Sequence, residues 1–175
     1  DELKFEATSI EIIDKDKIIV ADKGVKILSS EKIVIDADKM RYEKEKKFLQ
    51  AEGNIIIRDR SENIEIYSDK ITYDKNAEKI VSSGNVEIKF ENNYILNTKE
   101  IVYLKNSKEI MINYTTKIKD NFENEIQLEL LNYNLSSKLL KGKKVKLQDL
   151  QKNLYYFDSA IIDFSKNKII ADNVN

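Results

Sequence analysis

Two pairs of carboxylates are the side chains of this sequence most suited to chemistry. Asp14 and Asp16 are two residues apart, as are Asp36 and Asp38, and carboxylates at this spacing begin the loops that bind calcium. The glycine and the terminal glutamate that complete such a loop follow neither pair. We therefore interpret Asp14 and Asp16 as turn residues, and Asp36 and Asp38 as residues that flank an irregularity in a strand.

Composition excludes most other catalytic sites. The 175 residues include no Cys and no His, so the sequence lacks the usual nucleophile pairs and the usual zinc ligands. Carboxylate pairs also catalyse glycoside hydrolysis, but no pair lies in a loop that departs from the repeat described below. We predict no catalytic residue, no metal and no cofactor, and we expect a protein that is not an enzyme.

The densest basic run consists of Lys138, Lys141, Lys143, Lys144 and Lys146. Nucleic-acid binding would need a basic domain with aromatic side chains free to stack on bases, but 30 basic and 31 acidic residues give a net charge of -1. We favour a solvent-exposed strand whose lysines discourage pairing at a sheet edge, with phosphate contacts as the alternative. No nucleic-acid partner is expected.

All of these residues belong to a chain that repeats itself. One marker position, mostly aromatic, recurs at spacings of 30, 31, 30, 30 and 31 residues: Ile12, Tyr42, Tyr73, Tyr103, Tyr133 and Phe164. A second marker, mostly glycine, recurs with it: Gly24, Gly53, Gly84, Tyr114, Gly142 and Asn173. Six units of about 30 residues predict one supersecondary unit stacked along the chain.

Within each unit, apolar and polar residues alternate with a period of two, which is typical of β-strands. The phase slips by one residue at Asp38–Lys39 and Asp69–Lys70, so we expect a bulge or bend there. The glycine in the second arm predicts a further bend, and the polar segments between arms predict hairpin turns. Residues 122–131 tolerate a helix by composition, but their alternation favours a strand.

The predicted fold is all-β: about twelve antiparallel strands from about six hairpin repeats, in one domain over residues 1–175. Burying each large aliphatic side chain contributes about 1.5–3 kcal/mol, so a sheet with one apolar face must close upon itself. A sandwich, a jelly roll and an open-sided trough all satisfy this requirement. The first and last strands should remain as unpaired edges.

The apolar face is the candidate functional surface. An ordinary packed core is the simpler interpretation. Small side chains interrupt the aliphatic ones, and they favour a groove that could hold long acyl chains. These small residues are Ala21, Ala51, Ser68, Ser82 and Thr98.

Segments 37–42 (ADKMRY) and 51–57 (AEGNIII), with their copies 68–73 (SDKITY) and 82–88 (SSGNVEI), resemble the OstA-like family of lipopolysaccharide-transport proteins. The resemblance is specific at residues 33–90 and continues over the chain as spacing and alternation. It implies a curved β-jelly-roll trough that holds the acyl chains of lipid A while sugars and phosphates stay in water. It also implies head-to-tail strand addition with neighbouring Lpt-type proteins, and a periplasmic location associated with the outer membrane.

The lining of that trough is implied by the resemblance and also follows from the alternation. We expect it to comprise Ile35, Met40, Tyr42, Leu49, Ile55, Ile57, Ile66, Ile71, Tyr73, Ile80, Val86, Ile88, Leu96, Ile101, Tyr103, Ile112 and Ile118.

Residues 153–160 and 168–174 are most similar to the N-terminal periplasmic domain of the LptD branch of this family, which precedes an outer-membrane barrel on the same chain. Because the sequence opens at Asp1 without Met or a leader, we expect a processed or excised piece of a longer envelope protein. The absence of Cys departs from LptD members that carry disulfides. The alternatives are a bridge protein like LptA and a fully packed structural repeat without lipid cargo.

Overall fold

A single antiparallel sheet forms the whole of the described structure. The computed structural model describes residues 3–29, 32–91 and 93–172. None of these residues is helical, so no membrane-spanning helix is present among them. The strands are β1 (Lys4–Glu6), β2 (Ser9–Ile13), β3 (Ile18–Leu28), β4 (Ile33–Glu43), β5 (Phe48–Asp59), β6 (Ile64–Asp74), β7 (Lys79–Phe90), β8 (Tyr94–Leu104), β9 (Glu109–Ile112), β10 (Thr116–Lys119), β11 (Glu125–Asn134), β12 (Leu139–Gln148), β13 (Leu154–Asp163) and β14 (Lys168–Asp172).

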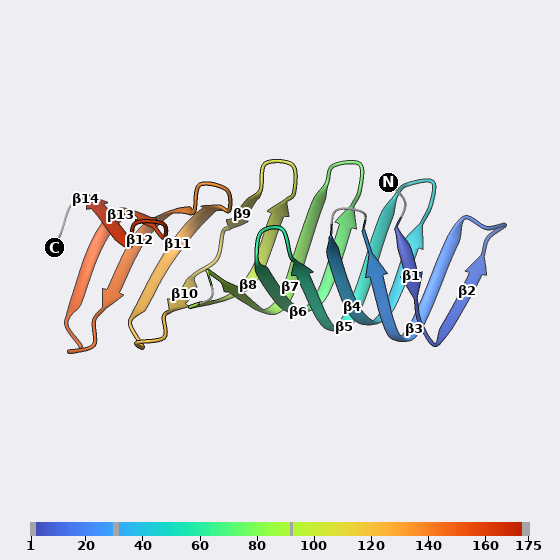
Figure 1. The fold of residues 1–175 in the computed structure, drawn as a ribbon, viewed down its shortest axis with the longest axis horizontal. Coiled ribbons are helices and arrows are strands. Elements are labelled where there is room, and N and C mark those ends of the chain that lie inside the picture. Colours follow the sequence, from blue (N-terminus) through green and yellow to red (C-terminus); the bar gives the residue numbers. More distant parts are fainter. Residues whose placement is uncertain (1–2, 30–31, 92, 173–175) are drawn as a thin grey trace.

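The long strands pair with one another in chain order, so the sheet grows along one axis from β2 at one end to β14 at the other (Figure 1). The all-β prediction is confirmed, and the sheet has 14 strands rather than about twelve. Two long strands are interrupted, which accounts for the difference. β1 and β2 both pair with β3, and β9 and β10, separated at residues 113–115, both pair with β8 and β11.

The long strands bend near their middle, and the repeated motif forms the bend. In β5 the register slips between Glu52 and Ile55, where Gly53 and Asn54 have φ of 81° and 46°. The Asn54 side-chain amide donates a hydrogen bond of 2.8 Å to Asp38 on β4. Asn85 and Asp69 make the same bond at 3.0 Å one unit later. The bulge predicted at Asp-Lys and the bend predicted at Gly therefore lie opposite each other on adjacent strands, and together they form one bend of the sheet.

The bends divide the sheet into two walls that face each other. Wall A is the half that carries the turns at 14–17, 44–47, 75–78, 105–108, 135–138 and 164–167. Wall B is the half that carries the connections at 60–63, 120–124 and 149–152. Apolar side chains from both walls fill the space between them and form one core. Charged and polar side chains alternate with them on the outer faces.

The small interior residues lie beside the bends, where the two walls meet. Ala51 and Ser82 precede the bends at Gly53 and Gly84, and Ser68 precedes the bulge at Lys70. Short side chains fit the narrow part of a wedge, while larger ones fill the wide part. Their size is therefore explained by the shape of the fold and does not by itself indicate an empty groove.

Two details differ from the sequence-based expectations, and one marker, Asn173, lies outside the described residues. In the fifth unit the left-handed position is Lys144, with φ of 49°, whereas Gly142 is buried in the core. Four lysines of the basic run, Lys141, Lys143, Lys144 and Lys146, lie on β12, which pairs with both β11 and β13, and Lys138 lies in the turn before it. These lysines therefore do not protect a sheet edge.

We predict that Gly53→Ala destabilises the protein more than Gly24→Ala. Both glycines have left-handed φ, 81° and 74°, so both variants lose about 1–2 kcal/mol of backbone energy. A Cβ on Gly53 would lie 2.8 Å from the Asp38 Cβ, whereas nothing lies within 4 Å of a Cβ on Gly24. The added clash should bring the total for Gly53→Ala to about 2–4 kcal/mol.

Urea unfolding of both variants and the wild type measures this difference. Equal losses for the two alanines would show that the close approach of Asp38 to Gly53 is not part of the folded structure.

Candidate functional site

All 17 residues expected to line the interior lie on the inward face of the sheet. Sixteen of them are at most 3% exposed. The exception is Tyr42, which is half-buried and packs against Phe5 of β1 with ring centroids 5.3 Å apart. The close packing of the sixteen buried residues closes the middle of the interior. The structure therefore brings the expected residues together as a core, and whether they bind lipid stays a prediction.

Near its C-terminal end the interior is open. A cavity of about 220 Å³ lies between the walls there. Wall B contributes Tyr94, Ile126 and Leu147 to its lining, and wall A contributes Ile162, Phe164 and Ile169. Polar residues line it as well: Asp120, Asn124, Asp163, Asn167 and Lys168.

The predicted lining ends at Ile118 and includes none of these apolar residues. The alternation that places residues on the inward face continues through β11 to β14, so it could have identified those that follow Ile118.

The N-terminal end is open as well. Ile10 and Ile12 on β2 pair with the inward-facing Ala21 and Ile19, so they point towards the interior. They are nevertheless 47% and 54% exposed, because β1 supplies only three residues to the facing wall.

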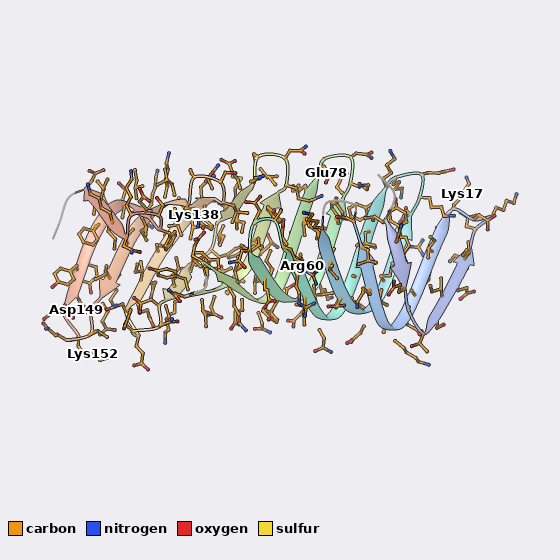
Figure 2. The ribbon with its side chains drawn as sticks, viewed as in Figure 1. Lys17, Arg60, Glu78, Lys138, Asp149 and Lys152 are labelled. Atoms are coloured by element: carbon orange, nitrogen blue, oxygen red, sulfur yellow. The ribbon has the colours of Figure 1, made fainter. Side chains whose placement is uncertain are left out.

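The two walls end differently. Lys17 of wall A lies at the N-terminal end of the molecule, and Asp149 and Lys152 of wall B lie at the C-terminal end (Figure 2). At the C-terminal end β14 continues wall A, whereas the first half of β13 is the last strand of wall B in the described residues. On this last strand of wall B, the inward-facing Tyr155 pairs with Leu147 and remains 39% exposed. Both ends of the molecule therefore present apolar side chains to solvent.

Opposite the bends, side chains join the two walls along a line that we call the seam. The seam consists of Asp59, Glu62 and Glu91 on wall B and Tyr103, Lys108, Tyr133 and Lys138 on wall A. The Tyr103 hydroxyl donates to Asp59 at 2.8 Å, and Lys108 Nζ lies 2.6 Å from Glu62 Oε1.

Glu91 continues the seam towards the C-terminus. It accepts from the Tyr133 hydroxyl at 2.8 Å and from Lys138 Nζ at 2.7 Å. Beneath it, the Tyr133 ring packs on Phe90 with centroids 5.2 Å apart. The seam therefore closes the wedge over its middle, and it ends where the cavity begins.

Asp59 is the most buried polar residue of the seam, at 3% exposure. Its Oδ1 accepts hydrogen bonds from the backbone N–H groups of Ser61 and Glu62 and from the Ser61 hydroxyl, while Oδ2 accepts from Tyr103. One carboxylate therefore shapes the 60–63 turn and ties that turn to the opposite wall.

A second polar cluster lies along the turns of wall A. Lys105 Nζ is 2.6 Å from Glu78 Oε2 and 2.9 Å from the Tyr73 hydroxyl. Burial raises the pKa of Tyr73 to about 12. Burial alone would raise the pKa of Glu78, but the hydrogen bonds from Lys105 and Tyr73 bring it below its ordinary value. The cluster joins neighbouring units of one wall.

The two carboxylate pairs lie where the sequence predicts them. Asp14 and Asp16 are in the 14–17 turn, and beside the bulge of β4 Asp36 pairs with Arg58 and Asp38 accepts from Asn54. No group of three or more potential metal ligands is present in the part of the chain that the structure describes.

We predict that Asp59→Ala destabilises the protein more than Asp163→Ala. Asp163 makes the same turn bonds with Ser165 and Lys166 that Asp59 makes with Ser61 and Glu62, but no bond to the other wall is seen for it in the described residues. Asp59→Ala also removes the charged acceptor of the Tyr103 hydroxyl, so we expect a loss of about 2–4 kcal/mol in the free energy of unfolding. Denaturant titration of both variants tests this, and equal losses would deny Asp59 a role across the seam.

We also predict that Tyr73 makes stability fall with rising pH in alkaline solution. The unfolded chain releases a tyrosine proton near pH 10, whereas folded Tyr73 keeps its proton up to about 12. The unfolded state therefore binds fewer protons between these values, and the free energy of unfolding decreases as pH rises through them. Tyr73→Phe should weaken this dependence, as measured by urea midpoints at pH 9 to 11.

Between pH 7 and 9 both states keep the Tyr73 proton, so the two proteins should differ there by a constant amount. An identical pH dependence above pH 10 would mean that Tyr73 is not protected as the structure indicates.

Comparisons with known proteins support the fold. No known family's sequence profile matches the chain, and no curated protein matches it in sequence. Among solved structures, the chain resembles LptH of Pseudomonas aeruginosa, the LptA-homologous periplasmic component of the conserved lipopolysaccharide transport device. The TM-score is 0.53 at 15% sequence identity, over 59% of this chain and 76% of LptH. At this identity the likeness shows the fold alone: the chain has an antiparallel β-jelly roll like that of LptH.

Proposed function

We propose that the chain is a non-enzymatic lipopolysaccharide-binding and transport module. It shields the acyl chains of lipid A between its two walls and passes them towards the outer membrane. The observation that carries this proposal is the continuous apolar interior, which is open to solvent at both ends of the sheet. The likeness in fold to LptH, a periplasmic transport component, supports the same conclusion.

The chemistry of the two faces suits an amphipathic ligand. Each methylene group moved from water into an apolar site contributes about 0.8 kcal/mol, so acyl chains would be held by burial alone. The outer faces and the turns carry the charged residues, where sugars and phosphates remain hydrated. Such a ligand needs no directional polar site inside the walls, and the buried side chains there are almost all apolar.

The partners proposed are lipopolysaccharide and neighbouring Lpt-type jelly rolls that add strands at the sheet ends. β14 pairs with β13 on one side only, and residues 154–158 of β13 pair only with β12 within the described residues. Such edges carry free backbone donors and acceptors that pair with an added strand. The proposed location is the periplasm, at the outer membrane.

Two places in the transport device are supported by different observations. The similarity of residues 153–160 and 168–174 to LptD favours an N-terminal domain that precedes a barrel on the same chain. The fold of LptH, an LptA homologue, favours a bridge between other components. The two differ in what meets the β14 end: the protein's own barrel domain or a separate jelly roll.

Lipid binding predicts a difference between neighbouring isoleucines at the C-terminal end. Ile169 lines the cavity, whereas Ile170 pairs with the outward-facing Ile161, and they are 42% and 52% exposed. A benzophenone amino acid at either position is therefore accessible and should be tolerated. With purified lipopolysaccharide and light, we expect adducts from Ile169 and few from Ile170.

Tyr155 and Tyr156 provide a second matched pair on wall B. Tyr155 faces inward, whereas the Tyr156 ring faces outward beneath Lys146. Adducts should again come from the inward position. Equal yields at inward and outward positions, or none from a folded protein, would support the packed structural repeat instead.

A further inference from the structure

The middle of the interior has no room for an acyl chain in this conformation. Inward residues such as Ile57, Ile66 and Ile80 are fully buried. The cavity that apolar side chains of both walls line lies at the C-terminal end, and a hollow of about 280 Å³ at the seam is lined mostly by polar residues such as Asp59, Glu62 and Lys108. A lipid that travels along the interior must therefore pass a region where the walls are in contact. Transport through this fold requires the walls to separate there.

The two long sides of the wedge resist separation very differently. At the bends the walls are continuous, because the same strands run through both and pair with their neighbours over most of their length. At the seam, the described residues join the walls through side chains alone. A sheet ladder opens only when many backbone hydrogen bonds break together, whereas side-chain contacts open locally.

The seam's ion pairs are partly exposed. Lys108 and Lys138 are about half exposed, while their partners Glu62 and Glu91 are mostly buried. A single ion pair with one solvated partner contributes less to stability than a strand ladder of many hydrogen bonds. When the walls separate, water can form hydrogen bonds with the charged groups of these pairs. The seam is therefore the weak boundary of the wedge.

The bends supply a hinge for such a motion. Gly53–Asn54 and Gly84–Asn85 hold left-handed backbone conformations, and each is clipped to the preceding strand by one asparagine–aspartate hydrogen bond. Small changes in φ and ψ at a row of equivalent positions would change the angle between the walls while both ladders stay intact.

We infer that the seam is a gate: acyl chains reach the middle of the interior only when the contacts of Asp59, Glu62 and Glu91 with the opposite wall open. This inference rests on the proposed function. It adds that the middle is loaded by parting of the walls, and that the C-terminal cavity is accessible without it.

The test locks the seam covalently. Because the sequence contains no Cys, Glu62→Cys/Lys108→Cys introduces two thiols that face each other across the seam, and a short bis-maleimide with an internal disulfide joins them. The control is Lys17→Cys/Glu45→Cys, which replaces an ion pair of 2.9 Å between adjacent turns of wall A. The probe is lipid A with a diazirine in one acyl chain, and mass spectrometry locates the attached peptides.

We expect the unlocked proteins and the locked control to be labelled both at the cavity, near Ile169, and in the middle, near Ile57 and Ile88. Locking the seam should abolish labelling in the middle and leave labelling at the cavity. Reduction of the cross-linker's disulfide should restore labelling in the middle. If the locked control also lost labelling in the middle, the inference would be overturned, because the loss would not be specific to the seam.

Other results separate the gate from the proposed function. Equal labelling of the middle in the locked and unlocked seam, or labelling of the cavity alone in the unlocked protein, would overturn the gate and leave lipid binding standing. No labelling of the folded wild type at any position would overturn the proposed function, and the gate with it.

Discussion

A bend in the middle of each long strand is the constraint on which the rest of this structure depends. A straight sheet with one apolar face would expose that face to water, and bending along a common line folds the face against itself. The bend requires two successive left-handed residues, as at Gly53 and Asn54, and an aspartate on the preceding strand close enough to exclude a Cβ at the glycine. Because the corner recurs in each well-preserved unit, the bends line up and the walls stay opposed along the chain.

The wedge that results has one strong side and one weak side. The same strands run through the bends and pair on both sides of them. The opposite side is closed by side chains at strand ends and turns that are more than forty residues apart in sequence, such as Asp59 with Tyr103. Sequence-local contacts therefore build each wall, and a few long-range polar contacts set the distance between the walls. This division allows the angle of the wedge to change without loss of the sheet.

Much of the fold could be predicted because the strand period is two and the unit repeats. Alternation alone places Ile57 and Ile88 inside, and the phase slip at Asp38 locates the bulge. The prediction failed where the units diverge. Lys144 occupies the left-handed position of the fifth unit, since lysine tolerates that conformation at an exposed site, and its side chain carries no signal of the role. The seam could not be predicted either. The repeat marks Tyr103 and Tyr133, but spacing does not indicate that their partners are Asp59 and Glu91, because it does not show which strand end or turn faces which.

The unequal ends of the two walls bear on the proposed assembly. Because β14 belongs to wall A and wall B ends at the first half of β13, a strand added to β14 would lengthen wall A beside the exposed Tyr155 of wall B. The same addition would cover an apolar surface and extend the interior across the junction. Backbone pairing and burial then favour the same register, because a shift by one residue would turn the added strand's apolar side chains away from Tyr155. An end-to-end joint of this fold is thus selective for strands whose alternation continues that of the interior.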